Sequence, residues 1–386
     1  FGAIAALCAG GITVPANASP GELATFTWTV QNTGPNAAMG MWQDTVYLSQ
    51  DDVWDVSDTI VGTQTHLGPV APSATYTENL TVALPPIETG TYHVIVRTDA
   101  RNNVRETNEA NNLASSVLTV DVEVQQLTLG VPLNTTLVTG QEHYYRYDTT
   151  ADETLLVTLA GEAGSSNELY TRFGSIVSRA NYELQGSRQG EADQENVVDN
   201  TNAGTYYSMI RGDYIPGSFR DNLRRSPQKS KKTADGKDKP KLAPSTAENV
   251  TVNAAILPFS VRRVTPGFSG NQGFTVIAAE GAKFQEGATM KLVGPGGIEI
   301  TPLYNYYHSQ AKVAALFDMN EQAAGNYQVV VTNPNSQSAV WAEYFEIRNG
   351  GGGPRMRTEI IGPGKVRGDG ATFNRYIVSV SNDGSN

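Results

Sequence analysis

The feature that most constrains the fold is a series of short segments in which apolar and polar residues alternate. Between residues 24 and 124 these segments are ATFTWTV, DTVYLS, ATYTENLTVAL, GTYHVIVRT and ASSVLTVDVEV. Alternation of this kind places one face of a β-strand against a core and the other face in water. Turn-forming residues separate the segments about every ten residues, a spacing typical of β-sandwiches. We therefore predict an all-β chain of tandem β-sandwich domains.

The length of 386 residues exceeds that of one ordinary core and indicates two to four domains. Turn-rich seams divide the chain into five parts. We predict an N-terminal segment (1–11), three sandwiches (12–124, 125–256 and 257–348), and a Gly-rich linker with the start of a further domain (349–386). The linker contains NGGGGP, a composition that allows almost any relative orientation of the parts it connects.

The end of the chain repeats a pattern from its beginning. ATFTWTVQNTGPN at 24–36 is echoed by ATFNRYIVSVSNDGSN at 371–386, and each combines an alternating segment with Asn-x-Gly-x-Asn. The interval from Asn32 to Asn382 gives a repeat period of 350 residues. This pattern predicts one period of a longer tandem array. The segment FGAIAALCAGG at 1–11 is interpreted as the tail of a removed signal or of a preceding domain.

Two motifs in the first predicted sandwich carry a family resemblance. They are VQNTGPNAA at 30–38 and GTYHVIVRTDARNNVRETNEANN at 90–112. Together they resemble the CARDB family, which are bacterial adhesion-related domains. The resemblance implies an immunoglobulin-like sandwich, and the chain's last residues resemble the start of a second CARDB repeat.

The next two units resemble other families. LNTTLVTGQEHYYRYDTTADETLLVTLAG at 133–161 and NAGTYYSMIRGD at 202–213 resemble the bacterial pre-peptidase C-terminal domain, a jelly-roll-like sandwich. The third unit, through SVRRVTPGFSGNQGFTVIAAEGAKF at 260–284 and AAGNYQVVVTNPNS at 323–336, resembles the immunoglobulin-like IPT/TIG fold. These resemblances imply extracellular binding or spacer modules, none of which is catalytic by itself.

Charge and cysteine content exclude several classes of function. The net charge is -11 and the isoelectric point is near 4.9, so the surface repels phosphate and we expect no specific nucleic-acid binding. The single cysteine, Cys8, allows neither an intrachain disulfide nor a Cys-based zinc site. No apolar run approaches the roughly 20 residues of a membrane span, so we predict none.

One stretch departs from the acidic composition. Residues 220–242 contain nine Lys or Arg and three Asp, a local charge of +6 inserted before the last predicted strand of the second unit. Two interpretations stay open. Its polar composition is typical of a disordered surface insertion. Its charge is equally that of a tether for an acidic neighbouring subunit or another anionic surface or polymer.

The sequence offers no recognisable catalytic set. His66, His93, His143 and His308 stand alone, without an HExxH motif, a Gly-x-Ser-x-Gly elbow or a phosphate-binding glycine loop. Glu106 and Glu109 are the types of residue that form an acid/base pair, but they lie in a turn without pocket-forming loops. We therefore predict that the chain is not an enzyme.

Two acidic groups make calcium the strongest chemical candidate. Hard cations take several oxygen ligands, and the chain offers such oxygens in two places. The first group lies in one loop and the second follows a predicted strand: Asp51, Asp52, Asp55 and Asp58, then Asp99, Glu106 and Glu109. The alternative is that the aspartates form Asx-turns and that the Asn-rich second segment is a turn that redirects the chain. A shared site requires the two groups to lie at one end of the sandwich.

We predict an extracellular structural or adhesion protein, in which tandem sandwiches form a stalk or fibre with neighbouring repeats or subunits as partners. One alternative is that these are ancillary domains of a secreted enzyme such as a protease. The other is a carbohydrate-binding module, suggested by Trp42, Trp54 and the tyrosines of 304–307. Two Arg-Gly-Asp triplets, at 211–213 and 367–369, are interpreted as turn or strand-end residues and not as receptor ligands.

Overall fold

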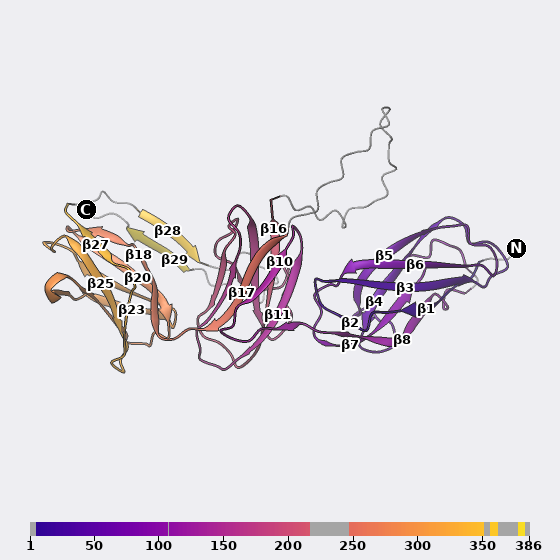
Figure 1. Ribbon diagram of the computed structural model, residues 1–386, viewed down its shortest axis with the longest axis horizontal. Helices are drawn as coiled ribbons and strands as arrows, with labels where there is room; N and C mark the ends of the chain where they lie inside the picture. The colour runs from indigo at the N-terminus through magenta and orange to yellow at the C-terminus, as the bar shows by residue number, and fades with distance from the viewer. Residues whose placement is uncertain (1–4, 107, 217–246, 351–355, 362–376, 383–386) are drawn as a thin grey trace, which may run out of the picture.

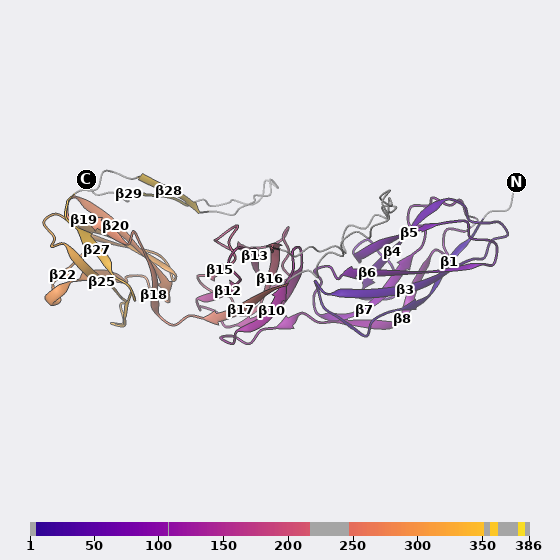
Figure 2. The same ribbon diagram turned by 45° about the horizontal axis from the view of Figure 1, so that its top comes forward.

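A computed structural model describes residues 5–106, 108–216, 247–350, 356–361 and 377–382. Three β-sandwiches follow one another along the long axis of the molecule, and the N-terminus lies at one far end (Figure 1). Figure 2 shows the same linear order after rotation. Apart from one 3-10 turn, η1 (Pro295–Gly297), the described residues contain strands and connections. The predicted all-β tandem-sandwich fold is confirmed. None of the described helical segments is long and apolar enough to span a membrane.

The first domain packs a three-stranded sheet against a five-stranded one. The smaller sheet has the order β1 (Leu7–Thr13), β3 (Leu23–Asn32), β6 (Thr75–Ala83). The larger has the order β2 (Asn17–Ala18), β8 (Leu113–Val122), β7 (Gly90–Arg97), β4 (Met41–Ser49), β5 (Thr59–Leu67). Alternation in β3 buries Phe26, Trp28 and Val30 completely and leaves the intervening threonines on the outer face. The core lies between the two sheets.

The N-terminal segment belongs to this domain. β1 pairs antiparallel with β3, from Leu7 opposite Asn32 to Thr13 opposite Thr27. Leu7 is fully buried. The expectation that residues 1–11 lack a partner in their own domain is therefore wrong for the described part. The short apolar run fills the sandwich edge because it too alternates between buried and partly buried residues.

A buried carboxylate joins the two sheets. Asp44 on β4 is fully buried, and its Oδ2 accepts hydrogen bonds from Trp28 Nε1 and Tyr76 Oη, each at 2.9 Å. Its Oδ1 accepts bonds from Thr98 Oγ1 at 2.6 Å and from the Asp99 N–H at 3.2 Å. Four donors therefore compensate the desolvation of one charged group.

The second domain contains sheets of four and five strands. The first has the order β10 (Leu133–Leu137), β17 (Glu248–Ile256), β12 (Leu155–Ala160), β15 (Gln194–Val198). The second has the order β14 (Leu184–Gln185), β13 (Ser166–Phe173), β16 (Gly204–Tyr214), β11 (Glu142–Thr149), β9 (Gln125–Gln126). β17 follows the basic insertion yet occupies an interior position. Buried Glu248, its first residue, accepts a hydrogen bond from Ser165 Oγ at 2.6 Å and fixes the start of the strand.

The third domain has the same layered construction. One sheet has the order β18 (Ser260–Thr265), β20 (Phe274–Ala282), β24 (Lys312–Asp318), β23 (Tyr304–Ser309). The other has the order β19 (Phe268–Gly270), β27 (Phe345–Arg348), β25 (Gly325–Thr332), β21 (Thr289–Val293), β22 (Glu299–Ile300), with β26 (Ser338–Val340) paired to β25. Fully buried aromatic side chains fill the space between them: Phe284, Phe317, Tyr327 and Phe345.

The junction between the first two domains is short and packed. Only Glu123 and Val124 separate β8 from β9, and β9 already pairs with β11 of the second domain. Val124 is fully buried in an apolar cluster with Tyr144, Tyr170, Val177 and Met209. These side chains come from the second domain, so the linker itself is part of that domain's core.

Polar contacts also cross this first junction. Glu22 Oε1 lies 2.8 Å from His143 Nδ1, and the Ile176 N–H donates to Glu88 Oε1 at 3.4 Å. Gly21 has φ +82°, and a Cβ at this residue would lie 2.1 Å from the Glu142 carbonyl oxygen. Glycine is therefore required both by the backbone conformation and by the close approach of the two domains.

The junction between the second and third domains is also structured. Three residues, 257–259, connect β17 to β18, and the Leu257 N–H donates to the Thr154 carbonyl at 2.9 Å. Two ion pairs cross it: Lys283 Nζ with Glu153 Oε2 at 2.5 Å, and Arg262 Nη2 with Glu195 Oε2 at 3.1 Å. Neither junction contains a free linker.

Candidate functional site

The acidic motif after β7 builds a turn at the tip of the first domain. Asp99 is fully buried, and its two carboxylate oxygens accept the N–H groups of Asn103 and Val104, each at 2.8 Å. Asp99 and Asn102 have φ values of +41° and +52°, conformations that Asp and Asn tolerate better than most residues. Burial raises the pKa of Asp99, whereas the two N–H groups lower it. The turn function that the sequence predicted for this segment is confirmed.

Glu106 joins this turn to the N-terminal strand. Its Oε2 accepts the Leu7 N–H at 2.5 Å, and its backbone forms a bridge with Ala5. Burial raises the pKa of Glu106 to about 7; the bond from Leu7 opposes this shift, and the charges of Glu109 and Asp99 add to it. Glu106 therefore acts as an anchor for the incoming strand.

The other family motif anchors the same strand from the opposite side. Asn32 is fully buried, and its Oδ1 accepts the N–H groups of Ala6 at 3.2 Å and Gly34 at 3.0 Å. Its Nδ2 donates to the carbonyls of Asn36 and Val70. Two motifs that lie more than seventy residues apart thus meet at Ala6 and Leu7. The sequence analysis noted Asn32 as part of a repeat but did not predict this role.

The first acidic group forms local turns. Asp51 Oδ1 accepts the Val53 N–H, Asp55 Oδ1 accepts the Ser57 N–H, and Asp58 Oδ2 accepts the Asp55 N–H. The hydrogen bonds from Ser57 lower the pKa of Asp55. These are the Asx-turns considered above, and Asp52 is exposed beside them.

The two acidic groups lie at opposite ends of the first domain. Asp99 lies beside the start of β4, since the Ala100 N–H donates to the Gln43 carbonyl. The Asp51–Asp58 loop follows Ser49 at the other end of β4, roughly 17 Å from Asp44 at 3.4 Å per residue. The seven residues therefore do not form one shared site. Among the described residues, no group of three or more His, Cys, Asp or Glu converges to hold a metal ion.

The aromatic residues considered for carbohydrate binding have different environments. Trp42 is buried, and its Nε1 donates to Tyr76 Oη at 2.9 Å. Trp54 packs edge-on against Tyr47, and Arg97 lies over its ring. The side chains of Tyr304 and Tyr306 on β23 are exposed, with ring centroids 6.4 Å apart.

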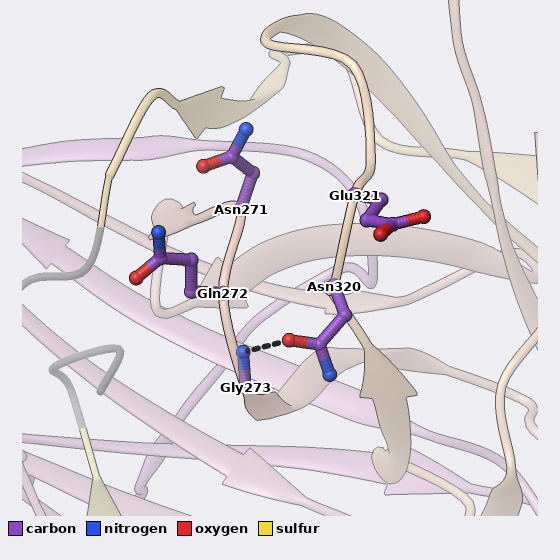
Figure 3. A pocket seen from close by; sticks show the side chains of 5 residues that line it. All are labelled: Asn271, Gln272, Gly273, Asn320 and Glu321. Atoms are coloured by element: carbon purple, nitrogen blue, oxygen red, sulfur yellow. Dashed lines mark hydrogen bonds between the residues drawn. The ribbon is translucent and has the colours of Figure 1, made fainter.

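A shallow hollow lies in the third domain between the start of β20 and the turn after β24. Its lining residues are Asn271, Gln272, Gly273, Asn320 and Glu321. Asn320 Oδ1 accepts the Gly273 N–H at 2.9 Å, and Glu321 points away from Asn271 and Gln272 (Figure 3). The hollow is lined by amides and one carboxylate, and its lining contains no histidine, serine or cysteine.

The first Arg-Gly-Asp triplet lies in β16. Arg211 Nη1 is 2.9 Å from Asp213 and 3.4 Å from Glu168, and its side chain is largely buried. The arginine is therefore occupied within the fold. The second triplet and the basic stretch 220–242 lie outside the described residues.

The CARDB family model matches residues 6–116, and both anchoring motifs lie within this range. Residues 6–116 are a CARDB domain. The match starts at residue 6 and not at 12, in agreement with the pairing of β1 inside the first sandwich. No curated protein matches the chain.

Solved structures similar to parts of the chain include two bacterial or archaeal modules of the predicted kinds. The CARDB domain of a Pyrococcus furiosus protein in complex with di-metal ions is 22% identical, with 31% of this chain and 90% of that chain covered and a TM-score of 0.24. The pre-peptidase C-terminal domain of a Bacillus anthracis collagenase is 13% identical, with 34% and 94% covered and a TM-score of 0.23. A Bifidobacterium adolescentis β-glucosidase is 20% identical, with 32% and 18% covered and a TM-score of 0.22.

Proposed function

We propose that residues 5–348 form a rigid, non-catalytic spacer in an extracellular adhesion-type protein of tandem β-sandwiches. The observation that carries this proposal is the construction of the two junctions. Val124 is buried in the second domain's apolar cluster, and Thr154 accepts the N–H of Leu257 immediately after β17. Because the linkers are two and three residues long and both are bonded, bending requires loss of buried contacts.

The C-terminal strands support a tandem arrangement. β28 (Met356–Ile361) pairs antiparallel with β29 (Ile377–Asn382), and Met356 lies opposite Asn382. In the first domain, Leu7 of β1 lies opposite Asn32 of β3 in the same way. We propose that β28 and β29 begin a second CARDB-like unit, and that neighbouring repeats of this kind are the spacer's partners.

Small-angle X-ray scattering on the 386-residue chain tests the spacer. An extended rigid body gives a pair-distance distribution with a long tail and a maximum dimension close to that of the coordinates in Figure 1. A compact distribution, or one that fits only a broad ensemble of domain orientations, would refute it. Localisation is a separate test: protease treatment of intact cells must remove the domains if they are extracellular.

The tyrosines of β23 favour a second candidate, binding of a polysaccharide to the third domain. Asn305 Oδ1 accepts the Met290 N–H at 2.8 Å, which fixes β23 while Tyr304 and Tyr306 stay exposed. Exposed aromatic rings spaced along a strand suit the apolar faces of sugar rings. A glycan array with no bound sugar, or with the same sugars bound by the Tyr304→Ala, Tyr306→Ala double variant, would exclude this candidate.

A further inference from the structure

The tip of the first domain concentrates negative charge without a cation. Asp99, Glu106 and Glu109 are close enough for their charges to affect one another. Within the described residues, no Lys, Arg or His forms an ion pair with any of the three. Like charges gathered in a partly buried site are unfavourable unless a counter-charge is bound.

The side-chain amide of Asn112 lies among these carboxylates. Its Nδ2 is 3.4 Å from Glu106 Oε1 and 3.2 Å from Glu109 Oε2. Asn112 is 3% exposed, and its Oδ1 is buried without a hydrogen-bond partner. The neighbouring Asn111 Oδ1 is also buried and unpartnered. A buried acceptor without a donor is costly, so its position beside two carboxylates needs an explanation.

We propose that Glu106, Glu109 and Asn112 form a binding site for one calcium ion at the tip of the CARDB domain. A point near the present Nδ2 position reaches one oxygen of each glutamate. A half-turn of the amide exchanges its oxygen and nitrogen and supplies the third oxygen ligand there. Carboxylate and amide oxygens are ligands of the kind that calcium takes, and water completes the six to eight ligands it requires.

The remaining acidic residues have other functions. Both carboxylate oxygens of Asp99 accept backbone N–H groups, so Asp99 contributes charge but no ligand. Asp51, Asp55 and Asp58 are used in turns at the other end of β4. The proposed site therefore keeps two of the seven acidic residues considered from sequence and adds an asparagine.

The site is connected to the N-terminal strand through Glu106. Its Oε2 accepts the Leu7 N–H, while its Oε1 faces Asn112. One carboxylate can thus bind the strand and the ion at the same time, so calcium stiffens the attachment of β1. This site is independent of the spacer proposal, because it lies at the domain tip and not at a junction.

Calorimetric titration of calcium chloride into the EDTA-stripped 386-residue chain tests the site. We expect a single site with a Kd of about 10⁻⁴ to 10⁻³ M, the range of extracellular calcium modules with few charged ligands. Glu109→Gln should weaken binding about tenfold or more. Asp52→Asn, which removes the same charge from the other acidic loop, should leave binding unchanged.

A second measurement distinguishes ligand loss from misfolding. In EDTA, Glu109→Gln should melt at the same temperature as the unmodified chain or higher, because it removes one of three like charges. Added calcium should then raise the melting temperature of the unmodified chain and of Asp52→Asn, but not that of Glu109→Gln. No saturable calcium binding by the unmodified chain, or equal binding by Glu109→Gln, would overturn the proposal.

Discussion

The Leu7 N–H donates to Glu106 Oε2 at 2.5 Å, across 99 residues of sequence. This bond and the bond from the Ala6 N–H to Asn32 Oδ1 attach the first strand to the two family motifs. The motifs of the CARDB domain are therefore best explained as anchors for its N-terminal edge strand. An edge strand attached in this way leaves fewer free backbone groups at the tip of the molecule.

Loss of the Glu106 anchor should loosen β1 specifically. In Glu106→Ala the Leu7 N–H loses a charged acceptor, and we expect a cost of about 1–3 kcal/mol in the first domain. Hydrogen exchange measured by mass spectrometry should show faster exchange in peptides covering Ala6 to Thr13. Glu106→Gln, which retains a carbonyl acceptor, is the matched control and should exchange more slowly than the alanine variant.

The raised pKa of Glu106 predicts a pH dependence of stability. Its pKa is about 7 in the folded chain and 4.5 in the unfolded chain, so the folded state binds the proton more tightly. The stabilisation is complete below pH 4.5, falls as the pH rises, and is lost above pH 7. Denaturation in EDTA should show this decline, and Glu106→Gln should flatten it by about 2 kcal/mol across the window. An identical profile in the two proteins would contradict the assignment.

The Asp44 network should be a major source of stability in the first domain. Asp44→Ala leaves the buried Trp28 and Tyr76 donors and the Thr98 hydroxyl without their acceptor. We expect a loss of about 3–5 kcal/mol, the range for breaking a buried charged network. Tryptophan fluorescence reports this unfolding, because Trp28 and Trp42 lie in this core. A loss below about 1 kcal/mol would show that the network is dispensable.

The close approach at Gly21 gives a variant that disrupts one junction. In Gly21→Ala the new Cβ would lie 2.1 Å from the Glu142 carbonyl oxygen, so the domains must separate. Gly130→Ala is a matched control, because its φ of +79° is nearly that of Gly21 but no atom lies within 4 Å of its Cβ. Scattering should show a wider range of domain orientations for Gly21→Ala alone.

Much of the fold follows from local pattern in the sequence. Alternation in β3, β4, β7 and β8 predicts those strands because one face of each is buried. β1 was missed because its small residues give a weak alternating signal and its partner lies in the same domain only after folding. Two-residue strands such as β9 depend on tertiary pairing, which no local pattern specifies.

The candidate site was only partly predictable. Glu106 and Glu109 stand out as acidic residues, but nothing local shows that Asp99 is consumed by backbone N–H groups while Glu106 is not. The anchoring role of Asn32 depends on a contact with Ala6, which is 26 residues away. The burial of Asp44 between two tryptophan-bearing strands likewise depends on how the sheets pack.

The central claim is that the three domains form one rigid unit, and the distance between its two ends tests it most directly. Dyes placed on exposed Met39 and Ile298 after their exchange for cysteine, with Cys8 replaced by serine, lie on the first and third domains. We predict a single narrow distribution in single-molecule energy transfer, unchanged by salt and broadened by Gly21→Ala. A broad distribution in the unmodified background, or one that collapses to short distances, would contradict the account.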